Sequence, residues 1–387
     1  MILPEFSING HKIGGENPVF VVAEISGNHH QKYKEAEALV RAAKEAGADA
    51  VKLQTYTADT ITLNSDKEWF RVGVEADNPE LWKGKTLYQL YQTAFTPWDW
   101  QPKLKKLADE LGILLFSSPF DTTAVGFLEK MNVQFYKIAS YEVNDCILLK
   151  RVAQTGKPVI MSIGYASVED VELALKTLRE NGAKDIAILQ CITDYKSEAD
   201  EDHANLATIQ DIAQKWGVVA GFSDNSGGID VPAMAMRAGA AIVEKHIILD
   251  RKLGGPDADF SLEPDELKEL VLILHGKKQY VFDEERYKKV LGEPHYGPRN
   301  DLEKYNLRWR RSLFAAKDIK KGEKFTAENI RSVRPGFGLH TKYFDQVMNK
   351  TAAQDIEFCT PLKKEHIYGM ISSEMEVSGE DRQSNVF

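Results

Sequence analysis

The sequence predicts an α/β protein whose first and larger part is a closed (β/α)8 (TIM) barrel and whose second part is a small domain rich in short strands. Short β-branched runs alternate with stretches of helical periodicity over residues 19–275, and eight such runs can be counted. Beyond residue 276 this alternation stops. Eight strands that alternate with helices fit a closed barrel better than an open, doubly wound sheet.

The candidate strands are short, β-branched and mostly apolar. They occupy residues 19–25, 50–56, 114–120, 135–140, 159–164, 186–191, 218–224 and 241–247. The helical candidates occupy residues 32–45, 97–111, 168–180, 204–216 and 232–238, and residues 264–275 supply the closing helix. Residues 56–96 interrupt the rhythm with irregular polar and aromatic sequence after the second strand. Because barrel enzymes build their sites at the C-terminal ends of the strands, we interpret this insertion as a lid, with a plain solvated insertion as the alternative.

The composition change after the barrel divides the chain into four parts. The barrel covers residues 1–276, a charged and aromatic linker covers 277–311, the second domain covers 312–369 and a polar tail covers 370–387. We expect the linker to be extended. The tail is acidic and polar, which is typical of a segment that carries no packed core.

Charge and cysteine content exclude several classes of function. The net charge of −9 and the pI of about 5.6 provide no overall basic field for nucleic acid or an anionic membrane surface. Only Cys146, Cys191 and Cys359 are present, and they lie far apart, which argues against a disulfide framework and a zinc site. No run approaches the roughly 20 apolar residues of a membrane span, and no signal peptide is evident at the start. These features predict a cytoplasmic location.

Polar residues collect at the C-terminal ends of the candidate strands, where a barrel holds its active site. These residues are Glu24, Lys52, Gln54, Ser117, Ser118, Lys137, Ser140, Glu142, Ser162, Cys191, Ser223, Asp224, Glu244, Lys245 and His246. Two lysines with several hydroxyls suit a small anion that carries a phosphate and a carboxylate. The alternative is that Lys52 and Lys137 only neutralise barrel carboxylates such as Glu24, Glu142 or Glu244.

Three further features carry weaker signals. Glu24 is a candidate acid or base, whereas His29 and His30 are loop or substrate contacts, or have no role. His246 is a candidate ligand for a divalent metal if Asn225 or Asp224 converges on it, and a structural histidine otherwise. In the second domain, RPGFGLH at residues 334–340 combines a guanidinium with a rigid proline and two glycines, so it is either a ligand-binding loop or an ordinary surface turn.

At these residues the sequence resembles the sialic acid synthase family, whose members join a barrel to a small antifreeze-like (SAF) domain. The matching segments run from Pro18 to Leu362 and include AEISGNH, GADAVKLQTY, FSSPFD, YKIASYE, GKPVIMSIG, GFSDNS, EKHIILD, GPDADFSLEPDEL, DIKKGEKFTAENI and RPGFGLH. Within the family, the segments NSDKEWF, LYQLYQTAFTPWDW, FSLEP and RRSLF are most similar to the pseudaminic acid synthases.

The resemblance implies a role for individual residues. It implies phosphoenolpyruvate binding by Lys52, Ser118, Lys137, Ser140, Ser162, Thr193 and Ser223, with Glu24, Lys52 and Lys137 as the catalytic groups. It implies sugar binding by Gln54, Glu142, Tyr195, Asp257 and an Arg334 that a domain-swapped partner subunit supplies. Mn²⁺ or Mg²⁺ would bind His246 and Asn225. The chain departs from the family at Asn225, where a second histidine is usual, and also at Ile192 and Lys196 around the sixth strand.

The implied activity is a condensation of phosphoenolpyruvate with diacetamido-trideoxy-L-altrose and water, which gives pseudaminic acid and phosphate, by a homodimer. The alternatives within the family are N-acetylneuraminate and legionaminate synthases. Two more remote alternatives are a Schiff-base aldolase that uses Lys137 as its nucleophile and a carbohydrate-binding protein. A binding protein would not require a barrel with a charged rim.

Overall fold

The computed structural model describes residues 4–73 and 83–370, and it contains the predicted barrel. Eight parallel strands close in the order β10-β3-β4-β5-β6-β7-β8-β9. Their bounds are β3 (Phe20–Glu24), β4 (Ala50–Thr55), β5 (Leu114–Pro119), β6 (Tyr136–Ile138), β7 (Val159–Ser162), β8 (Ile186–Lys196), β9 (Val219–Ser226) and β10 (Ile242–His246). Each lies within or overlaps one predicted run, so the fold class is confirmed.

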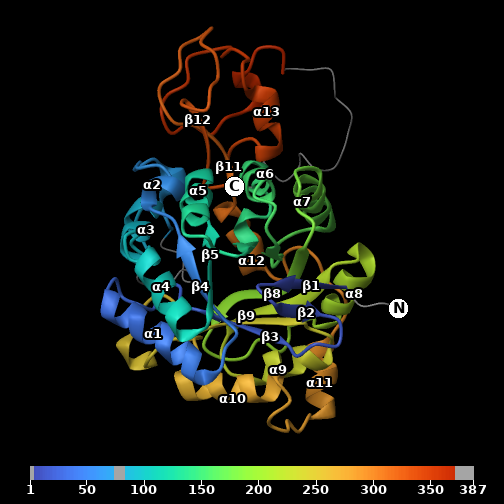
Figure 1. Cartoon of the computed structure of the whole chain (residues 1–387). Coiled ribbons are helices and arrows are strands. Elements are labelled where there is room, and N and C mark those ends of the chain that lie inside the picture. The colour runs from blue at the N-terminus through green and yellow to red at the C-terminus, as the bar shows by residue number, and fades with distance from the viewer. Residues whose placement is uncertain (1–3, 74–82, 371–387) are drawn as a thin grey trace.

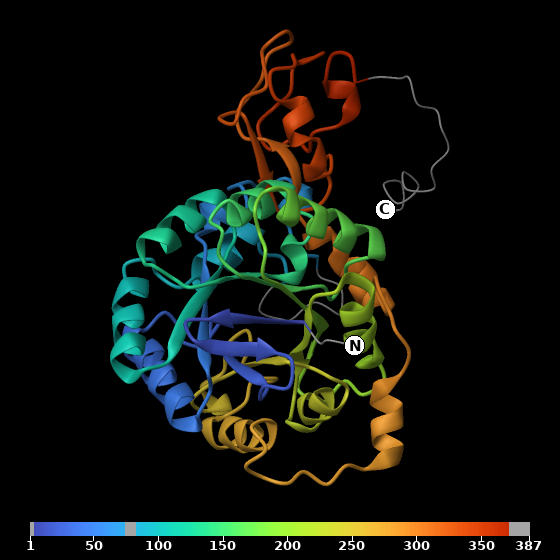
Figure 2. The ribbon, with the colours of Figure 1, turned by 45° about the vertical axis from the view of Figure 1, so that its right-hand side comes forward.

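Helices surround the barrel (Figure 2). They are α1 (Tyr33–Ala46), α4 (Gln101–Leu111), α5 (Thr122–Lys130), α6 (Cys146–Ala153), α7 (Val168–Glu180), α8 (Ala207–Trp216), α9 (Asp230–Arg237) and α10 (Pro264–Leu274). The six predicted helices are present. The sequence analysis did not name α5 and α6, which are short and begin after the side-chain caps Asp121 and Asp145. In the described part of the chain, no helix is long and apolar enough to cross a membrane.

An N-terminal hairpin, β1 (Glu5–Ile8) and β2 (His11–Gly14), covers the N-terminal end of the barrel, where Figure 2 shows it in blue across the opening. Phe6, Ile8 and Ile13 of the hairpin share one buried apolar cluster with barrel residues that include Phe20 and Val219. The sequence analysis did not predict this hairpin. It closes the end of the barrel that is opposite to the predicted site.

Alternate residues of each strand point into the barrel, because successive side chains of a strand point to opposite faces. In β4, Val51 and Leu53 belong to the cluster between the strands and the helices, whereas Ala50 belongs to the interior cluster. Lys52 and Gln54 have the same parity as Ala50 and therefore continue the interior row. The interior is thus apolar at the N-terminal end of the strands and polar at the C-terminal end.

The insertion after β4 packs between the barrel and the second domain. It contains α2 (Ala58–Ile61), η1 (Glu68–Phe70) and α3 (Leu87–Ala94), while residues 74–82 lie outside the described residues. The Arg334 backbone N–H donates to the Ile61 carbonyl at 2.9 Å, and the rings of Phe70 and Phe314 lie 5.3 Å apart. The described part of the insertion therefore holds the second domain in place, and the role of a lid stays a prediction.

The linker, residues 277–311, is not extended as we expected. It contains α11 (Glu284–Leu291), α12 (Asp301–Asn306) and η4 (Leu307–Trp309). Asp283 and Asn300 cap the two α-helices through side-chain hydrogen bonds, and Val290 and Trp309 are buried. Val290 packs in the apolar cluster of the barrel, and Trp309 packs with Val72 and Leu87 of the insertion, which explains why a charged segment folds onto the molecule.

The second domain lies at one side of the barrel, near α2, α5 and α6 (Figure 1). It is built on the antiparallel strands β11 (Ser312–Ala315) and β12 (Ile330–Val333). The shorter elements η5 (Thr341–Tyr343), α13 (Phe344–Val347) and η6 (Lys364–His366) complete it. Its own apolar core includes Leu313, Phe325 and Ile356. The tail beyond residue 370 lies outside the described residues.

Candidate active site

Two buried lysines and two buried carboxylates meet at the C-terminal end of the barrel interior. Lys52 Nζ lies 2.9 Å from Glu24 Oε2 and 3.1 Å from Glu244 Oε1. Lys137 Nζ lies 3.4 Å from the same Glu244 oxygen. The four side chains come from β3, β4, β6 and β10. We call these four residues the lysine–glutamate cluster. The alternative expectation, that the lysines pair with barrel carboxylates, therefore holds for Glu24 and Glu244.

The pKa values of the two lysines are shifted in opposite directions. Burial acts to lower the pKa of Lys52, but Glu24 and Glu244 outweigh it and hold that pKa well above the ordinary value. Burial lowers the pKa of Lys137, and repulsion from Lys52 acts in the same direction, whereas Glu244 opposes both. Burial acts to raise the pKa of Glu244, yet Lys137 and Lys52 bring it down to about 2. Glu244 is therefore ionised at any working pH, and Lys137 is the more easily deprotonated lysine.

Hydroxyl groups line the cluster. Lys137 Nζ donates to Ser162 Oγ at 2.6 Å, and Ser223 Oγ donates to Glu244 Oε1 at 3.1 Å. Ser140 Oγ accepts from the Gly164 N–H at 3.1 Å. Ser118 Oγ is buried and has no hydrogen-bond partner among the described residues. Because a buried hydroxyl without a partner is costly, Ser118 indicates that an acceptor belongs there.

One wall of the site joins Glu24 to the loop after β10. Gln54 Nε2 donates to Glu24 Oε1 at 3.0 Å and lies 3.3 Å from Ser26 Oγ, and Ser26 donates in turn to Asp257. Ser26 adopts a left-handed backbone with φ of 52°. The predicted sugar contacts Gln54 and Asp257 are thereby linked to the predicted acid or base.

His246 and Asn225 were the predicted metal ligands. His246 Nδ1 is buried without a hydrogen-bond partner among the described residues, and burial lowers the pKa of its ring, which keeps it neutral. Asn225 Nδ2 donates to the Ile192 carbonyl at 2.8 Å, which leaves the amide oxygen as the ligand atom. In residues 4–73 and 83–370 no three His, Cys, Asp or Glu side chains are grouped to hold an ion. The imidazole nitrogen and the amide oxygen are donor atoms of the kind that a hard divalent ion accepts, and metal binding at these two residues stays a prediction.

A second charged group lies where the barrel meets the second domain. Glu142 Oε1 accepts from Arg334 Nη2 at 2.6 Å and from Arg311 Nε at 3.1 Å. Arg334 Nη1 also donates to the Tyr91 hydroxyl at 3.1 Å, and its guanidinium lies 4.8 Å from the centre of the Tyr141 ring. This Arg334 belongs to the chain's own second domain. The exchange of domains between subunits stays a prediction.

Tyr195, another predicted sugar contact, ends the irregular part of β8. Its φ is 53°, its side chain is partly exposed, and its ring contacts Phe260 at 5.5 Å between centroids. The Phe260 ring also contacts His246 at 4.9 Å. Tyr195, Phe260 and His246 therefore form a continuous aromatic wall beside Asp257.

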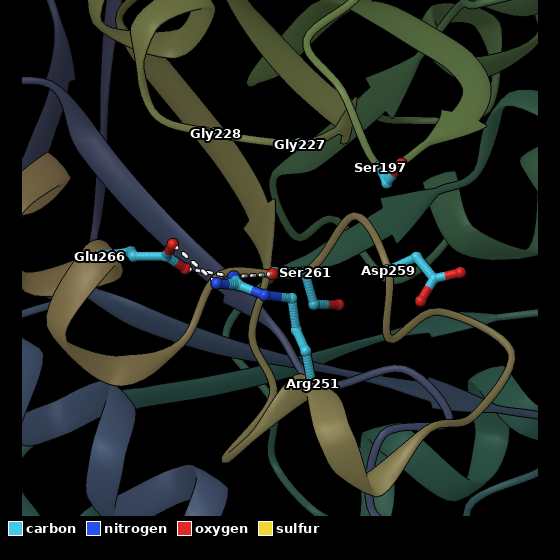
Figure 3. Close-up of a pocket in the computed structure, with 7 residues that line it drawn as sticks. All are labelled: Ser197, Gly227, Gly228, Arg251, Asp259, Ser261 and Glu266. Atoms are coloured by element: carbon cyan, nitrogen blue, oxygen red, sulfur yellow. Dashed lines mark hydrogen bonds and ion pairs between the residues drawn. The ribbon is translucent and has the colours of Figure 1, made fainter.

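A cavity of about 390 Å³ lies beside the loop that follows β10. Its lining residues are Ser197, Gly227, Gly228, Arg251, Asp259, Ser261 and Glu266. Figure 3 shows Arg251 turned toward Glu266, with Ser197 and Asp259 on the other side. None of the four residues of the lysine–glutamate cluster lines this cavity.

Several predicted polar residues lie outside the site. Ser117 bonds Thr55 on the outer face of the sheet at 2.6 Å, and Lys245 pairs with Asp224 at 3.1 Å. Ser117, Asp224 and Lys245 each lie one position before or after an interior residue, so their side chains point to the opposite face of the sheet. His29 bonds Thr96 at 2.9 Å, and burial lowers the pKa of its ring to about 4. His30 bonds Glu35 and the Gly254 carbonyl, each at 2.6 Å, so both histidines order the loop.

The sequence analysis missed Arg311, Arg299 and Glu303 of the linker. Arg311 is fully buried and, besides Glu142, donates to the Phe120 carbonyl at 2.6 Å. Arg299 and Glu303 form a buried ion pair that contacts Thr193 at the end of β8. The available signal was the paired arginines of the RRSLF segment, whereas no local signal marks Arg299 or Glu303.

Comparison with known proteins gives consistent matches over the chain. The model of the NeuB family matches residues 39–282, and that of the SAF domain matches residues 310–367. A pseudaminic acid synthase of Campylobacter jejuni is 39% identical over 352 residues, which cover 90% of this chain and 96% of that protein. An N,N'-diacetyllegionaminic acid synthase of Legionella pneumophila is 32% identical and covers 93% and 98% of the two chains. The crystal structure of the spore coat polysaccharide biosynthesis protein SpsE of Bacillus subtilis superposes with a TM-score of 0.78 at 32% identity, over 94% of this chain and 99% of that one.

Proposed function

The chain belongs to the NeuB family and carries a SAF domain, and from this premise we propose that it is a pseudaminic acid synthase. The reaction joins phosphoenolpyruvate to diacetamido-trideoxy-L-altrose, consumes water and releases phosphate. The observation that carries the proposal is the pair of buried lysines at the C-terminal end of the barrel, together with Ser118, whose hydroxyl has no hydrogen-bond partner among the residues that the structure describes. The 39% identity to a pseudaminic acid synthase, against 32% to a legionaminic acid synthase, supports the choice of sugar.

Phosphoenolpyruvate matches the charges and donors of the lysine–glutamate cluster. Lys52 and Lys137 supply two ammonium groups in a nearly dry site, where charge-assisted hydrogen bonds are strong. Ser162 and Ser223 bond members of the cluster, and Ser118 and Ser140 are further buried hydroxyl groups of these strand ends, whereas the Thr193 hydroxyl is bonded to Glu303 and Arg299. In the complex, phosphate and carboxylate oxygens accept the hydrogen bonds that the lysines now give to Glu24 and Glu244.

The bond changes follow from these positions. The methylene carbon of phosphoenolpyruvate attacks C1 of the open-chain aldehyde, a carbon–carbon bond forms, and the aldehyde oxygen takes up a proton. Positive character then develops at C2, water adds there, and Glu24 accepts the proton of that water. The tetrahedral intermediate collapses with cleavage of the C2–O bond, and phosphate leaves. Gln54, which donates to one oxygen of Glu24, fixes the orientation of this carboxylate.

His246 and the amide oxygen of Asn225 would hold Mn²⁺ or Mg²⁺ next to the aldehyde. A divalent ion bound there polarises the aldehyde oxygen as a Lewis acid. The two residues contribute one neutral imidazole and one neutral amide, so the site carries no ligand charge of its own. We therefore expect weaker binding than at a site with two histidines.

The sugar lies above the cluster, between the wall of Gln54 and Asp257 and the junction of Glu142 with Arg334. Tyr195 borders it from β8. We also propose that the active form is a domain-swapped homodimer in which each second domain supplies Arg334 to the other barrel. In the single chain Arg334 contacts the chain's own Glu142, and the exchange is proposed from the family resemblance alone. A cytoplasmic location, inferred from three unpaired cysteines, stays a prediction.

A panel of aldehydes tests the substrate. The enzyme is incubated with phosphoenolpyruvate, a divalent ion and, in turn, the precursors of pseudaminate, legionaminate and N-acetylneuraminate, and the products are identified by mass spectrometry. The proposal predicts the highest kcat/KM for diacetamido-trideoxy-L-altrose. A higher kcat/KM for the legionaminate precursor would make the chain a legionaminic acid synthase instead.

One observation favours a Schiff-base aldolase, because burial lowers the pKa of Lys137 and a neutral amine is the nucleophile of that class. Borohydride reduction in the presence of pyruvate separates the two chemistries. We expect no covalent adduct on Lys137, because its ammonium group binds an anion. An adduct on the Lys137 peptide would establish the aldolase.

A further inference from the structure

The linker reaches into the site through one buried ion pair. Glu303 on α12 and Arg299 just before it are bonded through two nitrogens and both carboxylate oxygens, and their side chains are 0% and 2% exposed. Thr193 Oγ1 donates to Glu303 Oε1 and accepts from Arg299 Nη2 at 3.1 Å. Both hydrogen-bonding roles of the Thr193 hydroxyl are thus filled by residues more than a hundred positions away in the chain.

The ion pair is itself fixed in place. The Arg299 backbone N–H donates to Glu303 Oε2 at 2.7 Å, and Arg299 Nη1 donates to the His203 carbonyl at 2.7 Å in the loop after β8. Asn300 caps α12 by accepting from the Glu303 N–H at 2.8 Å. A buried ion pair adds little to stability by itself, but loss of one partner leaves a buried charge. Such a pair holds its neighbours in one geometry.

Thr193 transmits this geometry to the lysine–glutamate cluster. A Cβ placed on Gly164 would lie 2.4 Å from Thr193 Cγ2 and 3.3 Å from Ser140 Oγ, so the three residues are in close contact. The Gly164 N–H donates to Ser140 Oγ, and Tyr165 donates to the Thr193 carbonyl at 3.4 Å. A rotation of Thr193 would therefore displace the turn that orients Ser140 beside the cluster.

We propose that Arg299 and Glu303 are positioning residues for phosphoenolpyruvate, which they serve by fixing Thr193 and, through Gly164, Ser140. This inference rests on the proposed function. It assigns the linker to the catalytic machinery, because the anion end of the site takes its final form only when α12 is docked on β8. The same segment continues to Arg311, so docking of the linker and delivery of the second domain are one structural event.

A double-mutant cycle on substrate affinity tests the proposal. Phosphoenolpyruvate alone is titrated calorimetrically into the wild-type enzyme, Glu303→Gln, Thr193→Val and the double variant. We expect each single variant to weaken binding by about tenfold and the double variant to be no weaker than Thr193→Val, because both changes remove the same constraint. In turnover assays, the KM for phosphoenolpyruvate should rise while the KM for the sugar stays unchanged.

Arg286→Gln is the matched control. Arg286 also lies in the linker, but its ion-pair partners are Glu201 at 2.5 Å and Asp230 at 2.7 Å instead of Glu303. Its loss should lower the melting temperature and leave phosphoenolpyruvate affinity unchanged. Arg299→Lys, which keeps the charge but not the forked contact, provides a second positioning variant should Glu303→Gln fold poorly.

The possible results separate the two claims. Additive losses in the cycle, or an equal loss of affinity in Arg286→Gln, would show that the ion pair serves stability only and would overturn the positioning role. A wild-type enzyme that binds no phosphoenolpyruvate would overturn the proposed function itself.

Discussion

The two ends of the barrel interior are built from the same strands but from opposite kinds of residue. Toward the N-terminal end, Phe116 stacks on Phe135 with 3.9 Å between ring centres, and the hairpin β1–β2 covers them. Two positions further along the chain from these two residues lie Ser118 and Lys137. Lys137 belongs to the lysine–glutamate cluster, and Ser118 lies at the same end of the barrel. One end therefore stabilises the fold, whereas the other binds and converts substrate.

The comparison shows how the fold tolerates its site. Burying ammonium and carboxylate groups costs free energy that the apolar end must offset. The cluster also keeps polar atoms without partners, such as Ser118 Oγ and Glu244 Oε2 in the described part of the chain, which an apolar core would not contain. A mutation at the charged end should therefore change catalysis, and one at the apolar end should change stability.

The largest effect is expected at the charged end. Lys52→Ala and Lys137→Ala should each lower turnover by at least about 10³-fold, because each removes a charge contact to phosphoenolpyruvate in a dry site. Circular dichroism should show a folded protein in both cases. A near-normal KM for phosphoenolpyruvate in both variants would remove the assignment of the lysines.

At the apolar end of the barrel interior, we expect a mutation to change stability and to leave catalysis nearly unchanged. Phe116→Ala should lower the free energy of unfolding by about 3–5 kcal/mol, because it empties a fully buried, stacked position. Denaturant titration measures this loss. The kcat of the folded enzyme should stay within about twofold of wild type. A large fall in kcat would mean that the two ends of the interior are not separable.

The metal ligands should give an intermediate effect at the charged end. Chelation should abolish activity, and His246→Ala should lower metal affinity by about 100-fold, since it removes the only imidazole of the pair. Asn225→Ala should cost less, because water replaces an amide oxygen, and Asn225→His should keep or tighten binding. Full activity after exhaustive chelation would contradict the Lewis-acid role and leave aldehyde activation to Lys52 or Glu24.

Arg334 tests the junction above the charged end. Arg334→Ala should raise the KM for the sugar by about tenfold, with a smaller change for phosphoenolpyruvate, because a charge-assisted contact is lost on the sugar side. Mixing this variant with Lys137→Ala should restore activity, because in a swapped dimer one barrel receives both intact groups. Mixed dimers that stay inactive would argue against the exchange of domains.

The smallest effect should be a loss of affinity for phosphoenolpyruvate at alkaline pH. Since burial lowers the pKa of Lys137, the ammonium form that binds the anion is complete below that pKa and is lost as pH rises through it. Affinity for phosphoenolpyruvate should therefore fall on the alkaline side, below the ordinary lysine value of 10.5. Lys52, with its raised pKa, causes no loss of affinity in this pH range. Lys137→Arg should shift this fall in affinity to higher pH. If the pH of the fall does not change, another group causes it.

Local patterns were sufficient to predict the barrel and most of the candidate site. The runs around Lys52 and Lys137 identify strands, and a charged residue within an apolar strand points to a site. The sequence analysis nevertheless placed Ser117, Asp224 and Lys245 with the site residues. It counted both faces of each strand end, although residues two positions apart share a face, as Lys52 and Gln54 do.

The remaining features depend on contacts between distant segments. The hairpin β1–β2 is too short to show a period, and its role follows only from packing on Phe20 and Val219. The linker was expected to be extended because its composition is charged. Glu303 is buried only because Thr193 and Arg299 bond it, a relation between positions that no local window contains.

The proposed condensation, with cleavage of the C2–O bond of phosphoenolpyruvate, can be tested by following the origin of the oxygen in the released phosphate. Phosphoenolpyruvate labelled with ¹⁸O at the bridge between C2 and phosphorus is incubated with the enzyme and diacetamido-trideoxy-L-altrose. The masses of both products are then measured by mass spectrometry. We expect a nine-carbon keto-sugar acid without the label and a phosphate that carries it, because the C2–O bond breaks. A label retained in the sugar acid, or phosphoenolpyruvate that is not consumed, would contradict the proposed condensation.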